Sequence, residues 1–493
     1  MITAVGANRG FSFTDKVMSQ SNVSCGAVGW IDKFKPSRQS QRPRGFRDDQ
    51  TDPAAERTWS SRAKSTIPSA FPRFQSTAGD QLDPRLTDRF AEARMKLRTA
   101  YTPAQPVTDP RMFAGRTEVL TSLIRAIEHQ RLHAVIYGER GIGKTSLVHV
   151  FTQAARDARY LVVYVPCGAD SDMNEMFRAL AAEVPLLFHS DYGPTSPEAE
   201  RGASLADILP SVPITARLAS DILAKIAGTR LLVLLDEFDR AESKQFRMNI
   251  AELVKNLSDR SVRVQIVIAG VAGNLTELIE YVPSIQRNVF AMQVPKMTAA
   301  EVRHLVQNGE DFSGVRFDDA SIRYVVAVAN GFPYLASLLS HHAGLAALDK
   351  GQMAVSVGEV SLAVNEALAE IKGRISKRSQ IQIETAVREG AHKFLGPLSG
   401  VALSTGGEFS KDDMRTLFST PESFSRCEKL IEHLASANIL IEGREGESHE
   451  FFRFIEESVP SYLWIFTAQA RFLESQTAAS MGSAISRHAA IEM

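Results

Sequence analysis

The chain has 493 residues, 44% of them hydrophobic and 23% charged, which excludes a fully disordered chain and is enough for about two to four folded domains. Its formal net charge of −1 excludes a uniformly basic or acidic protein, although residues 1–100 hold 17 Lys and Arg against 10 Asp and Glu, and residues 384–466 hold 8 against 14. The three cysteines are far apart in the sequence, so neither a disulfide framework nor a zinc site is expected.

Residues 1–83 are rich in Pro, Ser, Arg and Gln without apolar periodicity, which predicts a disordered basic arm. Such an arm could bind nucleic acid or an acidic partner, but a solvated tail is the favoured interpretation. The first residues lack the apolar core of a signal peptide, and no run of 18 apolar residues predicts a membrane span. The cysteine usage is typical of a reducing compartment, so we expect a cytoplasmic protein. Apolar residues at helical spacing predict a helix over residues 84–99.

Residues 84–296 are expected to form one α/β domain. An amphipathic helix over 113–130 is followed by short apolar runs with helical segments between them. Runs that are apolar on both faces and alternate with helices indicate a parallel sheet covered on both sides. The predicted strands of this five-stranded sheet are 132–137, 160–165, 230–236, 264–270 and 289–294.

A phosphate-binding loop follows the first predicted strand and precedes a helix, and it fits the pattern G-x-x-x-x-G-K-[ST]. Glycines let the backbone turn its N–H groups toward a phosphate, and the helix N-terminus favours the anion. Lys144 is expected to reach the β- and γ-phosphates, and Thr145 to give its hydroxyl to Mg²⁺. The nucleotide-binding residues predicted here are Gly138, Glu139, Arg140, Gly141, Ile142, Gly143, Lys144, Thr145 and Ser146.

A second acidic motif, LLVLLDEFDR, ends the third predicted strand at its carboxyl edge, where ligands bind in open α/β sheets. Asp236 is expected to hold Mg²⁺ directly or through water. Glu237 is expected to polarise the water that attacks the γ-phosphate. For Asp239 a helix N-cap is the favoured role. Together the two motifs predict an ATPase that uses ATP and Mg²⁺.

After Pro295 the strands are expected to stop, and residues 297–375 read as a lid of four helices. Residues 376–468 read as helices followed by strand, Gly-rich turn and strand, which predicts a winged-helix domain. Residues 469–493 are small and polar and are expected to be a flexible tail. The predicted fold is therefore a P-loop NTPase of α/β class, followed by an α-helical lid and a winged-helix domain.

The segment Phe113-Ala-Gly115-Arg116 resembles the F-x-G-R that opens AAA+ and STAND ATPase domains. The sequence GERGIGKTSL and the domain order resemble those of the archaeal-type and origin-recognition-like subset of these ATPases, over about residues 105–465. The resemblance implies that Phe113, Gly115 and Arg116 lie against the adenine. The lid segment Gly331-Phe332-Pro333 is similar to the Gly-x-Pro of STAND lids, which implies that Pro333 packs near the nucleotide.

Three positions separate fast motors from switches in these families. The fourth strand ends in IVIAGVAGN, which offers no polar sensor before Asn274. The lid has Gly-Phe-Pro where many AAA+ proteins carry an arginine. Arg287, just before the fifth strand, is either a catalytic finger that reaches a neighbour's γ-phosphate or a surface arginine, and both readings stay open. The departures predict slow hydrolysis.

We therefore expect a slow, Mg²⁺-dependent ATPase that acts as a conformational or assembly switch of AAA+/STAND type. The expected partners are ATP and ADP, together with a second copy of the chain or another protein. The alternative is a DNA-associated ATPase, either origin-loader-like or transposition-helper-like, that uses the basic arm or the winged helix. The wing EGREGESHE holds one arginine against four glutamates, so the winged-helix charge does not support DNA binding.

Overall fold

The computed structural model describes residues 89–491 except 104, 194, 261–262, 273–274, 276–282, 389–391, 406 and 446–448. The chain divides into two units, Met1–Ala78 and Gly79–Met493, and every described residue belongs to the second. The basic arm of residues 1–83 and the sensor candidate Asn274 lie outside the described residues.

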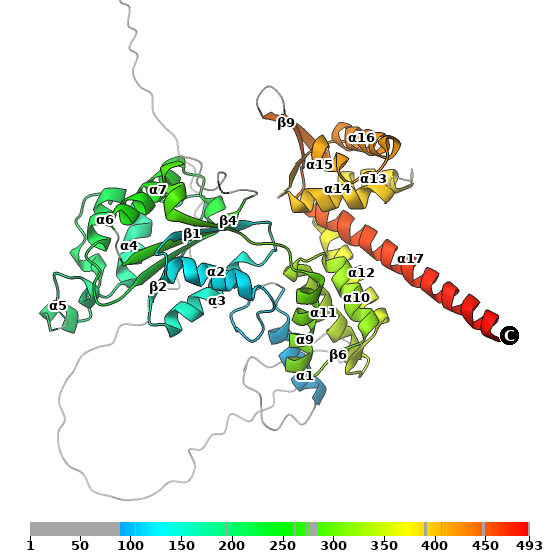
Figure 1. Cartoon of the computed structure of the whole chain (residues 1–493), viewed down its shortest axis with the longest axis horizontal. Helices are drawn as coiled ribbons and strands as arrows, with labels where there is room; N and C mark the ends of the chain where they lie inside the picture. Colours follow the sequence, from blue (N-terminus) through cyan, green and yellow to red (C-terminus); the bar gives the residue numbers. More distant parts are fainter. Residues whose placement is uncertain are drawn as a thin grey trace, which may run out of the picture. The chain divides into compact units, whose positions relative to one another are not determined.

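A five-stranded parallel sheet forms the centre of the part that runs from α2 to β5 (Figure 1), with the strand order β2-β3-β4-β1-β5. Every neighbouring pair is parallel, which confirms the predicted sheet. The strands begin and end within about one residue of the predicted runs. Each run is rich in β-branched residues or leucine and is bounded by turn residues, so the sequence marks both of its ends. They are β1 His133–Gly138, β2 Leu161–Pro166, β3 Leu231–Asp236, β4 Val264–Val271 and β5 Val289–Gln293.

Helices cover both faces of the sheet. Successive side chains of each strand point to opposite faces, so neighbouring residues of one strand pack against different helices. Ala134 and Ile136 pack in the same buried cluster as helices α2 and α3. Val135, between them, packs in the cluster that holds α4, α6 and α7. The elements are α2 Thr117–Glu128, α3 Lys144–Asp157, α4 Met173–Glu183, η1 Leu186–Phe188, α5 Pro197–Glu200, η2 Leu205–Ile208, α6 Ala216–Leu223, η3 Phe238–Arg240, α7 Lys244–Asp259 and η4 Pro283–Asn288.

The four lid helices are present as predicted: α9 Ala299–Ser313, α10 Asp319–Ala329, α11 Pro333–Asp349 and α12 Val357–Gly373. The expectation that strands stop after Pro295 is wrong, since β6 Arg316–Phe317 and β7 Ala354–Val355 form a short parallel pair between the helices. Two-residue strands carry no periodic signal. Helix α1, Arg89–Ala100, packs on α9 and α11 rather than on the sheet, so it belongs with the lid helices.

The C-terminal part begins with α13 Lys377–Ala386 and α14 His392–Ser404 and continues through α15 Lys411–Arg415 and α16 Pro421–Ser436. Strands β9 Leu440–Glu445 and β10 His449–Phe454 form the predicted hairpin. Strand β8, Glu408–Ser410, joins β10 as a third strand that the sequence did not indicate.

Helix α17 runs from Ser458 to Ile491, where a flexible tail was expected from residue 469. Its first half is anchored, since Leu463 and Ile465 are fully buried and the Phe472 ring stacks on Tyr324 of α10 at 3.9 Å. Once a helix is nucleated by packing, each further residue adds one hydrogen bond at little cost, so an Ala-rich segment continues it. Small and polar residues were therefore a poor sign of a loop.

Candidate nucleotide site

The loop between β1 and α3 has the backbone shape that a phosphate-binding loop requires. Gly141 and Gly143 have φ of 75° and 87°, a left-handed conformation that side chains other than glycine seldom adopt. Gly143 is the N-cap of α3, a helix of 14 residues. The free N–H groups of the first turn of α3 therefore face the loop, as an anion site needs.

The side chain of Lys144 is folded back into its own loop. It is buried, and its Nζ donates hydrogen bonds to the carbonyl oxygens of Gly138 at 2.9 Å and Glu139 at 2.8 Å. Burial lowers the pKa of Lys144 to about 8, although the nearby carboxylates of Asp239 and Asp236 oppose that shift. The ammonium group is thus held by two neutral acceptors that an anionic ligand could replace.

Asp236 ends β3 as a buried carboxylate with a donor on each oxygen. Its Oδ1 accepts from the backbone N–H of Glu237 at 2.9 Å, and its Oδ2 accepts from the Tyr164 hydroxyl at 2.7 Å. Burial, together with Asp236 itself, raises the pKa of Tyr164, so the hydroxyl stays protonated and acts as the donor. Tyr164 was not singled out from the sequence, although a tyrosine near the carboxyl end of an apolar strand could have indicated it.

Glu237 has a left-handed backbone with φ of 54°, and its exposed carboxylate pairs with Arg240 at 2.6 Å. The pair lies at the surface, where such a contact contributes about 0–1 kcal/mol. Glu237 can therefore leave Arg240 at little cost.

Asp239 does not cap a helix, and that expectation is wrong. Its Oδ1 accepts a 2.7 Å hydrogen bond from the backbone N–H of Val271, at the end of β4, while Ser243 caps α7. The backbone N–H of Val271 is therefore already occupied. At the described end of β4, Gly270, Val271 and Ala272 offer no side-chain donor, as the sequence predicted.

Arg116 links the segment before α2 to the loop and to the lid. Its backbone N–H donates to Glu301 Oε1 at 2.8 Å, and its Nη2 donates to the carbonyl of Pro295 at 3.1 Å. A Cβ placed on Gly143 would lie 2.9 Å from Arg116 Nη1, so the guanidinium reaches the phosphate-binding loop. Burial lowers the pKa of Arg116 to about 10, against the effect of Glu301, and its buried Nε has no hydrogen-bond partner among the described residues.

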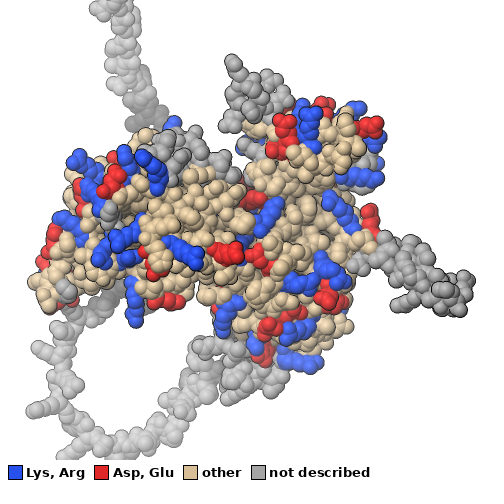
Figure 2. All heavy atoms as spheres, in the orientation of Figure 1, with Lys and Arg blue, Asp and Glu red and all other residues tan. Residues whose placement is uncertain are grey.

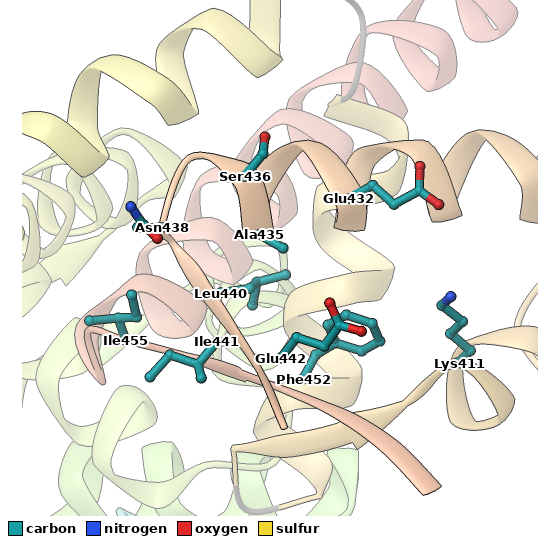
Figure 3. A pocket seen from close by; sticks show the side chains of 10 residues that line it. All are labelled: Lys411, Glu432, Ala435, Ser436, Asn438, Leu440, Ile441, Glu442, Phe452 and Ile455. Carbon is teal, nitrogen blue, oxygen red and sulfur yellow. The ribbon is translucent and has the colours of Figure 1, made fainter. Parts of the chain in front are cut away.

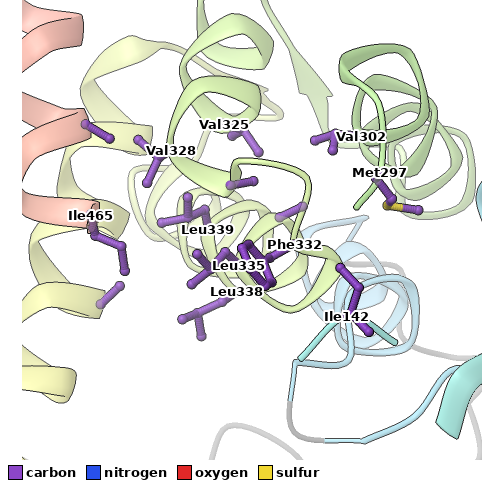
Figure 4. Packing of buried hydrophobic residues seen from close by; sticks show 14 of the residues in the cluster. Ile142, Met297, Val302, Val325, Val328, Phe332, Leu335, Leu338, Leu339 and Ile465 are labelled. Atoms are coloured by element: carbon purple, nitrogen blue, oxygen red, sulfur yellow. The ribbon is translucent and has the colours of Figure 1, made fainter. Parts of the chain in front are cut away.

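The Gly331-Phe332-Pro333 segment of the lid meets the same loop. A Cβ on Gly143 would lie 3.4 Å from Pro333 Cγ, and one on Gly141 would lie 3.5 Å from Tyr334 Cβ. Ile142, inside the loop, belongs to one buried cluster with Met297, Phe332 and Leu335 (Figure 4). Pro333 is also the first residue of α11, where its fixed φ suits the helix.

A match to a known domain covers this part of the chain. Residues 112–268 match the AAA ATPase domain, a range that includes both phosphate motifs. The matched range is called the AAA ATPase domain below. A comparison with curated proteins gives no match.

The solved structures that the chain matches share little sequence with it. The Orc1 protein of Aeropyrum pernix in complex with DNA is 16% identical, with a TM-score of 0.41, and the match covers 76% of this chain and 97% of that one. Cdc6p from Pyrobaculum aerophilum is 13% identical, with a TM-score of 0.42 and coverage of 77% and 98%. The RuvB Holliday junction branch migration motor of Thermotoga maritima is 14% identical, with a TM-score of 0.36 and coverage of 71% and 95%. Similarity at this level does not indicate a shared function.

Two further residues of the AAA ATPase loop are held by elements that the sequence did not indicate. Glu139 is partly buried, which raises its pKa to about 7 against the opposing effects of Lys296 and Lys144. Lys296 Nζ lies 3.9 Å from Glu139 Oε2. The Ser146 hydroxyl accepts a 3.0 Å hydrogen bond from the backbone N–H of Val107. No local pattern marks such partners, because they come from the segments before α2 and before the lid.

The remaining predicted residues lie before α2, in the phosphate-binding loop and in η4. Phe113 is half-buried against the core, and Gly115 has φ of 66° beside the Glu301 side chain. Arg140 is exposed and pairs with Glu457. Arg287 is exposed in η4, immediately before β5, as the sequence placed it.

A groove of about 590 Å³ lies outside the AAA ATPase domain, between the end of α16 and strands β9 and β10 (Figure 3). Its charged lining side chains are Lys411, Glu432 and Glu442. On the face shown in Figure 2, basic and acidic side chains are interspersed over this part of the chain.

Among the described residues, no helix is long and apolar enough to cross a membrane.

Proposed function

We propose that the chain binds ATP with Mg²⁺ at the loop of residues 138–146, hydrolyses it slowly, and changes the position of the lid as it does so. One observation carries the proposal: Arg116 from the segment before α2 and Pro333 from the lid meet at Gly143 of the phosphate-binding loop. A triphosphate in the loop would touch residues that belong to both parts. Its presence would therefore bias how the lid contacts the ATPase domain.

The residues of the loop fit a nucleoside triphosphate. The first-turn N–H groups of α3 would bind the phosphates, and Lys144 would exchange the carbonyls of Gly138 and Glu139 for phosphate oxygens. Thr145 and Asp236 offer a hydroxyl and a carboxylate, the hard oxygen donors that Mg²⁺ prefers. When bound there, Mg²⁺ would neutralise charge on the phosphates.

Glu237 is proposed as the residue that orients and polarises the attacking water. Two features support slow hydrolysis. The described end of β4 has no donor side chain for the γ-phosphate, and the surface pair of Glu237 with Arg240 adds a small further restraint. A switch requires slow ATP hydrolysis, because its ATP-bound state must last longer than one encounter with a partner.

A change in the nucleotide is proposed to move the lid of residues 297–375, and with it the winged helix of residues 376–468. Trp464 of α17 donates a 2.9 Å hydrogen bond to the carbonyl of Val328 in α10, so the C-terminal helix is fixed to a lid helix. The expected partner is a second copy of the chain or another protein. Arg287 is the candidate that would reach a neighbour's nucleotide.

A DNA-associated ATPase remains the second candidate. The net charge of +7 over residues 1–100 favours it, because phosphate affinity rises with clustered Lys and Arg. The net charge of −6 over residues 384–466 disfavours contact through the winged helix. A steep decrease of duplex affinity with salt in the full chain, dependent on ATP, would support this candidate.

Hydrogen exchange of the backbone tests the switch. ATP with Mg²⁺ should change protection of residues 295–301 and 330–336, and ADP should produce a different pattern from ATP. In Lys144→Ala the exchange should not respond to nucleotide. Protection that changes only in residues 138–146, with the lid unaffected by either nucleotide, would contradict the switch.

A further inference from the structure

Tyr164 makes contacts with both elements that carry the proposed metal ligands. It lies in β2, near the carboxyl end of the strand, and is half-buried. Its hydroxyl donates the 2.7 Å hydrogen bond to Asp236 of β3. Its ring stacks on the ring of His149 in α3, with centroids 5.4 Å apart and planes at 24°.

The position of His149 on α3 shows which face of that helix the Tyr164 ring contacts. Thr145 and His149 are four residues apart in one helix, so their side chains lie on the same face, one turn from each other. The Tyr164 ring therefore rests against the face of α3 that carries Thr145. The Tyr164 hydroxyl reaches the carboxylate that is expected to share a metal ion with Thr145.

Asp236 gains a fixed orientation from this contact. The terminal torsion of an aspartate has a broad, two-fold energy profile, so one donor alone leaves the carboxylate free to rock. Here each oxygen accepts one hydrogen bond, Oδ1 from the Glu237 backbone and Oδ2 from Tyr164. Each oxygen keeps further lone-pair capacity for a metal ion or its water.

We propose that Tyr164 is a positioning residue that sets the orientation of Asp236, and its distance from Thr145, for Mg²⁺. The inference rests on the proposed function, in which Thr145 and Asp236 hold the ion. Groups that hydrogen-bond to a metal ligand typically change metal affinity by about 10–100-fold when they are removed. Tyr164 acts through Asp236 and does not itself touch the nucleotide.

A purely structural role for the hydroxyl gives a different expectation, and Tyr160 supplies the matched control. Tyr160 precedes the same strand at its other end, and its hydroxyl accepts a 3.0 Å hydrogen bond from Arg230. Both tyrosine rings pack, partly buried, on the same hydrophobic cluster. Tyr160→Phe and Tyr164→Phe therefore each remove one hydroxyl hydrogen bond and keep the ring.

The experiment measures ATP affinity calorimetrically in excess EDTA and in excess Mg²⁺, and takes the ratio of the two as the metal coupling. In Tyr164→Phe the coupling should fall about tenfold, while affinity in EDTA and the unfolding midpoint match those of Tyr160→Phe. His149→Ala, which removes the stacking partner, should reduce the coupling in the same direction. Tyr160→Phe should keep the wild-type coupling.

Three results would decide against the inference. Wild-type coupling in Tyr164→Phe would overturn it alone, because ATP and Mg²⁺ would still bind as proposed. An equal loss of coupling in both Tyr→Phe variants would also overturn it, by showing a general effect of the strand. An absence of ATP binding in the wild type would overturn the proposed function and this inference together.

Discussion

Oε1 of Glu301 accepts a 2.8 Å hydrogen bond from the backbone N–H of Arg116, so the first lid helix is tied to the segment that precedes the phosphate-binding loop. The same carboxylate closes a capping box at the start of α9, where its Oε2 accepts from the N–H of Thr298. Glu301 therefore stabilises a helix end and joins two parts of the protein with one side chain.

Glu301→Ala should lower the free energy of unfolding by about 1–2 kcal/mol, through the lost cap, and should also change ATP affinity. Glu359→Ala is the control, because Glu359 closes a similar capping box in α12 and its side chain bonds to Ser356 and Lys350, which both lie among the lid residues 297–375. Denaturant unfolding and calorimetry measure the two effects. If both variants leave ATP affinity unchanged, the tie between Arg116 and Glu301 does not serve nucleotide binding.

Glu237→Gln should retain ATP affinity and stop steady-state phosphate release, because the amide cannot accept a proton from water. Arg240→Ala should raise the hydrolysis rate by at most about fivefold, since it frees Glu237 from a surface pair that contributes about 1 kcal/mol. Hydrolysis at the wild-type rate in Glu237→Gln would remove Glu237 from its proposed role.

Gly331→Ala should be strongly destabilising, because this glycine has φ of 78° and an added Cβ would lie 2.5 Å from the backbone oxygen of Met297. Gly351→Ala is the control for backbone strain without a steric clash, because Gly351 has φ of 70° and nothing lies within 4 Å of the added Cβ. We expect about 1 kcal/mol of destabilisation at Gly351 and at least about twice that at Gly331. Equal unfolding free energies in the two variants would show that the lid turn is not tightly packed.

Folding stability should fall below pH 6.5 because of His133. Burial lowers its pKa to about 4, and its Nδ1 accepts a 2.9 Å hydrogen bond from the N–H of Ile266. The unfolded chain binds the proton more tightly, so this contribution is complete above pH 6.5 and is lost as pH falls through 4. The loss is about 3 kcal/mol.

Unfolding measured between pH 7 and pH 4 should therefore be less pH-dependent in His133→Gln than in the wild type. The variant itself will be less stable at pH 7. Identical pH slopes in the two proteins would show that another group accounts for the acid sensitivity.

Arg287→Ala tests the open question of assembly. If Arg287 reaches a neighbour's nucleotide, ATP with Mg²⁺ should raise the mass of the wild type in solution, and the variant should stay at the lower mass. Arg217→Ala, which removes another exposed arginine from α6, should behave as the wild type. A wild-type mass that does not respond to ATP would make Arg287 a surface arginine and place the switch within one chain.

Much of the sheet and of the phosphate loop could be predicted because both depend on local patterns. The strands are continuous apolar runs, and the Gly138–Thr145 loop has fixed spacing for steric reasons. Contacts between distant segments could not be predicted in this way. Tyr164, Lys296 and Glu301 became partners of the site only through the fold, and Asp239 was assigned to a helix cap although it binds the end of β4.

The most direct test is a calorimetric titration of ATP with Mg²⁺ into the wild type and into Lys144→Ala. The wild type should bind one nucleotide per chain, because Lys144 can exchange its two carbonyl partners for phosphate oxygens. The variant should show no saturable binding while it unfolds at a similar temperature. An absence of binding in the wild type, or equal affinity in both proteins, would contradict the account.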